Sequence, residues 1–228
     1  MSVSKFIGHQ NIINTGLFFI GCGLAVAYGM GLWPITDWPE AMFFKGICIF
    51  MLFMMALTRG TDKGFDGGTK FLLMLALLSG TAGDALLEAP WEDAFLMGLG
   101  AFLVGHVFYI MLVLNNKDAK APPANKLLVG LVWIAVIANF IIMFMQQAEI
   151  TLPIIAYSLI LATMASTAIL SRFNLFYVGI GAILFMVSDM ILGLAMFIDI
   201  PSWMGNVVWA TYFPAQALLT LGICRGAK

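Results

Sequence analysis

The sequence predicts an all-α polytopic membrane protein, a bundle of eight transmembrane helices joined by short loops. The first observation behind this prediction is composition, because 62% of the 228 residues are hydrophobic, only 10% are charged, and the mean hydropathy is +0.99. Ordinary soluble proteins have about 45–50% apolar and about 25% charged residues. So few charges cannot solvate the surface of a soluble fold of this size, so lipid must be the solvent for most of the chain.

The second observation is the number and length of the apolar runs. A bilayer core about 30 Å thick requires about 20 helical residues. The predicted helices cover residues 12–32, 41–58, 69–88, 94–114, 127–147, 151–171, 174–198 and 203–224. The first run has no small-x-small cleavage site, so we read it as a retained helix and not as a signal peptide. Because the connections are short, residues 1–228 are predicted to form a single transmembrane domain.

The third observation is the separation of charge between the two sets of loops. With eight helices, ten of the eleven basic residues fall on one side: Lys5, Arg59, Lys63, Lys70, Lys117, Lys120, Lys126, Arg172, Arg225 and Lys228. The opposite loops carry acidic residues without any Lys or Arg: Asp37, Glu40, Glu92, Asp93, Glu149 and Asp199. By the positive-inside rule, both termini are predicted to be cytoplasmic. The compact loops and short chain favour a bacterial inner membrane, although an endoplasmic reticulum protein would share these features.

Several classes of function are disfavoured by what the chain lacks. A net charge of −1 without a basic cluster argues against a nucleic-acid partner, and no obligate protein partner is evident. The cysteines, Cys22, Cys48 and Cys224, lie in apolar runs without metal-ligand spacing, so we assign them no metal or redox role. A catalytic zinc site of three histidines cannot be assembled from His9 and His106 alone. A retinal-binding protein is disfavoured because the intramembrane lysine lies in the second helix.

Four ionisable residues remain inside the predicted spans: Lys45, Asp84, His106 and Asp189. A charge at the centre of a bilayer costs at least ~2.5–3.5 kcal/mol, so such residues face the bundle interior and mark functional sites. For Lys45 a buried ion pair or snorkelling is an equal alternative, and His106 can equally be a core histidine bonded to a neighbouring helix.

The depths of these residues are compatible with a common pocket. At ~1.5 Å per residue, Asp84 lies roughly 6 Å and Asp189 roughly 13 Å below the outer ends of their helices. Lys45 enters at the depth of Asp84, and Tyr157 and Tyr212 fall between the two aspartates. A polar pocket that opens toward the non-cytoplasmic face is therefore geometrically possible, whereas the convergence of these helices is not encoded in the depths alone.

Five short motifs in this order resemble the YhhN family of lysoplasmalogenase-like membrane hydrolases. They are Gly83-Asp84, the pattern G-x3-F-x3-H-x2-Y over 98–109, Pro153 with Tyr157, Ser188-Asp189, and Tyr212-Phe213-Pro214-Ala215-Gln216. The likeness covers most of the chain. One departure is Lys45-Gly46, where the family has Lys-Pro, so the local kink can differ while the charge is kept.

The resemblance implies hydrolysis of the vinyl ether bond of a lysoplasmalogen, a lysophospholipid with an ethanolamine or choline headgroup. The products are a fatty aldehyde and a glycerophospho-base, and the reaction is expected to need no metal and no cofactor. Protonation of the β-carbon requires a general acid, and a carboxylate must stabilise the oxocarbenium ion, which suits Asp84 and Asp189 as the catalytic pair. The expected substrate-binding residues are Lys45, His106, Tyr109, Tyr157, Ser188, Tyr212 and Gln216, with Lys45 holding the phosphate or tuning a carboxylate.

Two other interpretations remain open at this stage. A proton-coupled secondary transporter of a small amphiphilic solute would also keep aspartates and a lysine within its helices. A purely structural membrane protein would have to explain why two aspartates are kept in hydrocarbon.

Overall fold

Backbone polar groups inside a membrane must be satisfied internally, and the long apolar runs of this chain accordingly form helices. The computed structural model describes residues 12–32, 40–118, 121–145, 152–195, 199, 201 and 203–227. Its helices are α2 (Ile12–Gly29), α3 (Glu40–Thr58), α4 (Gly67–Leu87), α5 (Ala94–Asn115), α6 (Pro123–Met145), α7 (Leu152–Ile169), the π-helical turn η1 (Leu175–Gly179) continuing into α8 (Ile180–Leu194), and α9 (Met204–Cys224). Within the described residues, eight helical segments are long and apolar enough to cross a membrane, which confirms the predicted fold class.

Most helix ends lie within three residues of their predicted positions, and the larger differences have local causes. Helix α6 begins at Pro123, four residues before the predicted start, because proline suits the first helical position and the uncharged run begins only after Lys126. Helix α2 ends at Gly29, and Gly31 follows with a φ of 61°, a backbone conformation that favours glycine. Helix α8 ends at Leu194 and not at 198, while residues 146, 147, 151 and 196–198 of the predicted helices lie outside the described residues.

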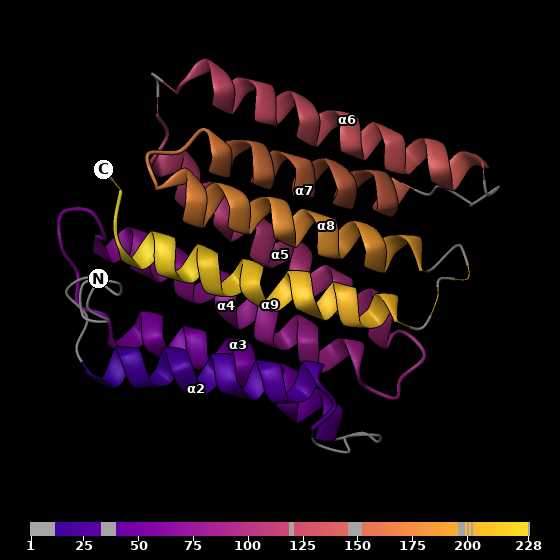
Figure 1. Ribbon diagram of the computed structural model, residues 1–228, viewed down its shortest axis with the longest axis horizontal. Coiled ribbons are helices and arrows are strands. Elements are labelled where there is room, and N and C mark those ends of the chain that lie inside the picture. The colour runs from indigo at the N-terminus through magenta and orange to yellow at the C-terminus, as the bar shows by residue number, and fades with distance from the viewer. Residues whose placement is uncertain are drawn as a thin grey trace.

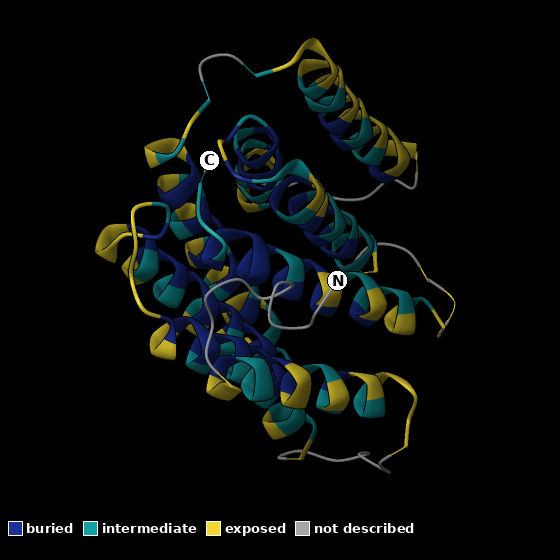
Figure 2. Ribbon diagram, turned by 60° about the vertical axis from the view of Figure 1, so that its left-hand side comes forward, coloured by how far each residue is buried: buried dark blue, intermediate teal, exposed yellow. Residues whose placement is uncertain are grey.

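The helices run side by side along the long axis of the molecule, with α6 at one edge and α2 at the other (Figure 1). Helix α9 occupies the middle, where it packs against α8, η1, α2, α3 and α4. Its most apolar stretch is 67% buried, against 17% for α6, which contacts only α7 and α8 among the described elements. Figure 2 shows the buried residues gathered inside the bundle and the exposed ones on its outward faces.

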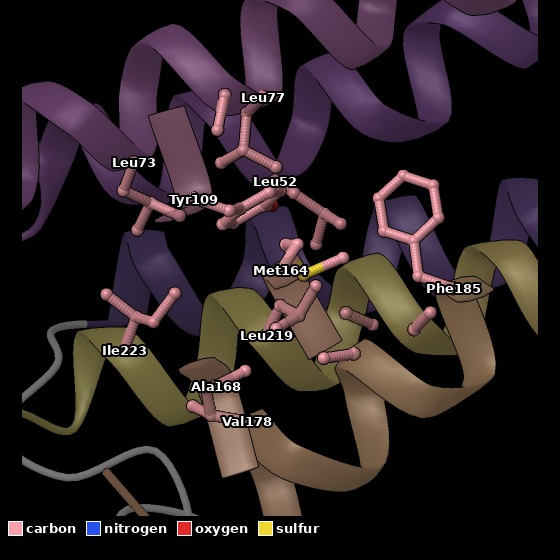
Figure 3. Packing of buried hydrophobic residues seen from close by; sticks show 14 of the residues in the cluster. Leu52, Leu73, Leu77, Tyr109, Met164, Ala168, Val178, Phe185, Leu219 and Ile223 are labelled. Carbon is pink, nitrogen blue, oxygen red and sulfur yellow. The ribbon is translucent and has the colours of Figure 1, made fainter. Parts of the chain in front are cut away.

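The core runs along the inside of the bundle and joins helices from both halves of the chain. Side chains of Leu77, Tyr109, Met164 and Leu219 meet there from α4, α5, α7 and α9 (Figure 3). All four are at most 2% exposed. This apolar packing fixes the positions of the helices that carry the polar residues described below.

Small residues allow α4 to approach α5 closely, as is common between helices in membranes. A Cβ atom added to Gly83 would lie 2.8 Å from the ring of Phe102, and one added to Gly98 would lie 2.8 Å from Leu87 and 3.2 Å from the carbonyl oxygen of Gly83. Both sites therefore require glycine, whereas Gly100 on the same helix as Gly98 has open space around it.

The loops at one end of the bundle are tied to each other and to the end of α9. Asp66 caps α4 by accepting a hydrogen bond from the Thr69 amide at 2.7 Å, and this bond holds the pKa of Asp66 below its ordinary value of 3.8. Arg59 donates to Asp62 at 2.6 Å and to the carbonyl oxygen of Cys224 at 3.3 Å. The Ala227 amide also donates to the carbonyl oxygen of Gly64 at 2.9 Å.

This end of the bundle also carries most of the basic residues. Helix α2 begins and α9 ends here (Figure 1). Of the basic residues that the structure describes, all except Lys45 lie in or next to the connections at this end: Arg59, Lys63, Lys70, Lys117, Lys126, Arg172 and Arg225. Lys5, Lys120 and Lys228 lie outside the described residues.

Replacing Gly83 by alanine is expected to destabilise the bundle by about 1–3 kcal/mol, because the new methyl group overlaps the Phe102 ring. The matched control is Gly100→Ala, which fills open space and gains helix propensity of up to about 1 kcal/mol. Thermal unfolding of the two variants in the same detergent measures the difference. A Gly83→Ala protein as stable as Gly100→Ala would show that the α4–α5 contact is not this close.

Candidate active site

The end of the bundle opposite the basic loops contains a cavity of about 360 Å³ between α2, α3, α4, α5, α8 and α9. Its walls combine polar and apolar side chains, including Tyr28, Lys45, Asp84, Phe102, Ser188, Asp189, Asn206, Trp209 and Tyr212. Five of the nine residues predicted for the site are among them: Lys45, Asp84, Ser188, Asp189 and Tyr212. The polar residues of distant helices therefore converge, as their predicted depths allowed.

Asp84 reaches the cavity from the last turn of α4 and is only 3% exposed. Tyr212 of α9 donates a hydrogen bond to its Oδ2 atom at 2.7 Å. The Tyr212 ring is held by edge contacts with Phe102 at 5.7 Å and Phe185 at 5.3 Å between ring centroids. Because aromatic rings on α5 and α8 fix the phenol, the carboxyl group of Asp84 has a defined orientation.

Asp189 reaches the same cavity from α8 and is 7% exposed. Tyr157 of α7 donates to its Oδ2 atom, and the Nε2 atom of His106 on α5 lies 3.1 Å from the same oxygen. The His106 ring packs against Phe185 at 4.7 Å between centroids. The Nδ1 atom of His106 is buried and has no hydrogen-bond partner in the part of the chain that the structure describes. His106 and Tyr157 thus stand behind Asp189 and position it.

The two carboxyl groups lie at closer depths than the sequence indicated. Because α8 ends at Leu194, Asp189 lies about 8 Å from the end of its helix, at ~1.5 Å per residue, and not about 13 Å. Asp84 lies about 5 Å from the end of α4 by the same rise. The difference arises because the apolar pattern continues beyond the residue at which the helix stops.

Lys45 of α3 forms an ion pair with Glu88, the residue that caps the end of α4. The side chains are 21% and 27% exposed, so the pair is partly shielded from solvent. The Lys45 ammonium also lies 5.7 Å from the centre of the Tyr28 ring. Lys45 therefore has a partly buried partner within the protein, and the same residue lines the cavity.

Three of the predicted substrate-binding residues bond to other parts of the protein. Tyr109 donates to the Oε1 atom of Gln216 at 2.7 Å, and both residues are 1% exposed. Neither of them is among the residues that line the cavity. Ser188 does line the cavity, but its hydroxyl group donates to the carbonyl oxygen of Val208 at 3.0 Å. This bond joins α8 to α9 next to Asp189.

Three cavity residues that carry a polar side-chain group were not predicted from the sequence: Tyr28, Asn206 and Trp209. Trp209 donates its indole N–H to the carbonyl oxygen of Ala25 at 2.9 Å, and its ring lies 4.8 Å from that of Tyr28. The signal for one of them was present, because Trp209 precedes Tyr212 by three residues and so lies on the same helix face. Tyr28 lacked any such signal, since the packing of α2 on α9 is not visible in sequence.

This fold and this cavity define an integral membrane protein with an internal polar site built on two carboxyl groups. A model of the YhhN family matches residues 40–223, and the chain belongs to the YhhN family, which confirms the resemblance seen in its motifs. Every site residue named above except Tyr28 lies within the matched range.

Relatives of known name support the same assignment. The chain is 31% identical over 160 residues to "Lysoplasmalogenase" of Mycobacterium tuberculosis, covering 68% of this chain and 61% of the relative, so it spans less than two thirds of that protein. It is 30% identical over 211 residues to "Lysoplasmalogenase TMEM86B" of Sus scrofa, covering 92% of this chain and 86% of the relative. The human protein of the latter name is 31% identical over 164 residues, covering 70% and 66%. No solved structure matches this chain.

Proposed function

We propose that this protein is a lysoplasmalogenase, which hydrolyses the vinyl ether bond of a lysoplasmalogen to a fatty aldehyde and a glycerophospho-base. The names of its relatives support this proposal. The observation that carries it is that Asp84 and Asp189, from α4 and α8, line one cavity and are each held by a tyrosine of a neighbouring helix. An amphiphilic substrate from the bilayer suits a cavity enclosed by membrane helices.

The reaction requires a proton donor first and a negative charge second. A carboxylic acid protonates the β-carbon of the vinyl ether, and the electron pair of the double bond forms the new C–H bond. The oxocarbenium ion that results is stabilised by the second carboxyl group in its ionised form. Water then adds to the cationic carbon, and the proton it loses restores one neutral carboxyl group to the pair. The hemiacetal collapses to the aldehyde and releases the glycerol oxygen.

The hydrogen bonds favour Asp84 as the acid and Asp189 as the ionised partner. If both ring nitrogens of His106 were protonated, the buried Nδ1–H would lack an acceptor, so the ring proton belongs on Nε2, from which it is donated to Asp189. Asp189 then accepts two hydrogen bonds, which stabilise its anion, whereas Asp84 accepts one, from Tyr212. Two carboxylates in one low-dielectric cavity do not both ionise cheaply, so Asp84 keeps its proton.

Asp84→Asn and Asp189→Asn are each expected to lower kcat for lysoplasmalogen hydrolysis by about 10²–10⁴-fold, since each removes one of the two charge or proton functions. The measurement is aldehyde release by the purified protein in detergent, with Asp93→Asn, an exposed carboxyl group at the same end, as the matched control. Folded variants that keep near-normal turnover would refute the assignment of these two residues.

His106→Phe is expected to lower kcat by about 10²-fold, because Asp189 loses a donor that stabilises its charge. His106→Gln retains an N–H group near the position of Nε2 and is expected to stay within about tenfold of the wild type. Measuring kcat and KM separately tests this, since a positioning residue behind Asp189 changes kcat and leaves KM nearly constant. Equal losses in the two variants would show that the ring serves packing only.

The proposed mechanism requires no metal, and activity is expected to survive a strong chelator. The transporter interpretation differs in a way that the same assay resolves. An enzyme releases aldehyde in detergent, where no gradient exists, whereas a carrier consumes no substrate there and moves its solute only in sealed vesicles. Replacing the vinyl ether lipid by its ester counterpart shows whether the alkenyl bond is the one that is cleaved.

We further propose that the protein lies in a bacterial inner membrane with both termini cytoplasmic, as the basic residues at one end of the bundle favour. In a Cys22→Ala background, an Asn206→Cys variant is expected to react with a membrane-impermeant maleimide on intact cells, because Asn206 is exposed at the cavity end. Lys63→Cys, exposed at the basic end, is expected to react only after permeabilisation. The reverse pattern of labelling would show that the termini face the outside of the cell and would contradict this proposal.

A further inference from the structure

The ion pair between Lys45 and Glu88 has no role in the proposed acid–base chemistry of the two aspartates. It lies next to a pair of aromatic rings. Lys45, Tyr28 and Trp209 all line the cavity, and Glu88 directly follows Leu87, which also lines it. The Tyr28 and Trp209 rings lie 4.8 Å apart, and the Trp209 ring is fixed by its bond to Ala25. A positive group, a negative group and two aromatic rings thus meet at one side of the cavity.

We infer that this group of residues is a site for a zwitterionic headgroup, in which Lys45 takes the phosphate and Glu88 takes the ammonium. The inference rests on the proposed function for the identity of the lipid. On binding, one internal ion pair is exchanged for two pairs with the ligand, so no charge is left unpaired in this shielded place. The Tyr28 ring, over which the Lys45 ammonium already lies, adds an aromatic surface that suits an ammonium group with or without methyl substituents.

The distance to the reacting groups fits such a lipid. Lys45, which would hold the phosphate, is paired with Glu88. Glu88 lies four residues after Asp84 on the same helix, about 6 Å along its axis. In a lysoplasmalogen about six bonds join the vinyl ether carbon to phosphorus, which span roughly 7 Å when extended. A headgroup held by Lys45 and Glu88 therefore leaves the vinyl ether within the region of Asp84.

The charges also predict which headgroup is rejected. A lipid that ends in a bare phosphate would pair with Lys45 and leave the Glu88 carboxylate unpaired beside a second negative charge. Specificity then comes from the penalty on the wrong ligand as much as from contacts with the right one. Glu88 is accordingly the specificity-determining residue, and Lys45 serves both kinds of headgroup.

The test compares two lipids with the same alkenyl chain, one with a phosphoethanolamine headgroup and one with a bare phosphate, on the purified full-length protein. The wild type is expected to have a KM about 10–100-fold lower for the ethanolamine lipid. Glu88→Gln is expected to raise that KM by about tenfold, to lower the KM for the phosphate lipid, and to leave kcat nearly constant. The control Glu92→Gln removes an exposed carboxylate from the loop after α4 and is expected to change neither KM.

The double variant Lys45→Glu/Glu88→Lys keeps an ion pair between α3 and α4 but exchanges its two ends. It is expected to fold and to keep the raised KM for the ethanolamine lipid. A wild-type KM in this variant, or equal effects of Glu88→Gln on both lipids, would overturn the inference.

A second readout separates this inference from the proposed function. Stabilisation of the protein against heat by non-cleavable alkyl ether analogues of the two lipids reports headgroup selectivity without turnover. If the analogues are distinguished but no aldehyde is released from either alkenyl lipid, the headgroup site stands and the proposed function fails. If aldehyde is released but both the KM values and the stabilisation are the same for the two headgroups, the function stands and this inference fails.

Discussion

A carboxyl group between membrane helices has no bulk water to bond with, so each one must find hydrogen-bond donors on its neighbours. Tyr212 supplies that donor to Asp84, and Tyr157 with His106 supplies it to Asp189. These bonds cross between helices, from α9 to α4 and from α7 and α5 to α8. The protonation of the two acids therefore depends on the arrangement of the helices, because moving a helix would remove a hydrogen-bond donor from a buried carboxyl group.

Helix α9 connects the two sets of donors and acceptors. It carries Tyr212, and its Val208 carbonyl oxygen accepts a hydrogen bond from the Ser188 hydroxyl group. Its Trp209 side chain donates a hydrogen bond to α2. Close packing of α4 on α5 depends on glycines, since Gly83 and Gly98 allow these two helices to approach each other beside Asp84. The other end of the bundle is fixed by loop contacts such as the bond from Ala227 to Gly64. A basic end whose loops are tied together and an opposite end that holds the cavity suit a protein that admits a lipid from one side.

Much of this was predictable from the sequence, and the limits have physical causes. The eight helices follow from the scarcity of charge, and Asp84 and Asp189 stand out because carboxyl groups are costly in lipid. The pairing of helices was not predictable, since lipid-facing and buried apolar residues look alike. That is why Tyr28 was missed, and why Tyr109 and Gln216 were expected at the cavity although they bond to each other away from it. The end of α8 was misplaced because apolar residues continue past Leu194.

The central claim is that one carboxyl group of the cavity protonates the vinyl ether carbon and that water then attacks the neighbouring carbon. Hydrolysis in water enriched in ¹⁸O, followed by mass spectrometry of the glycerophospho-base, tests it most directly. The proposed mechanism predicts that this product carries no ¹⁸O, because the bond between the glycerol carbon and its oxygen is never broken. Incorporation of ¹⁸O into the glycerol moiety would place the attack on the other side of the ether oxygen and contradict the mechanism.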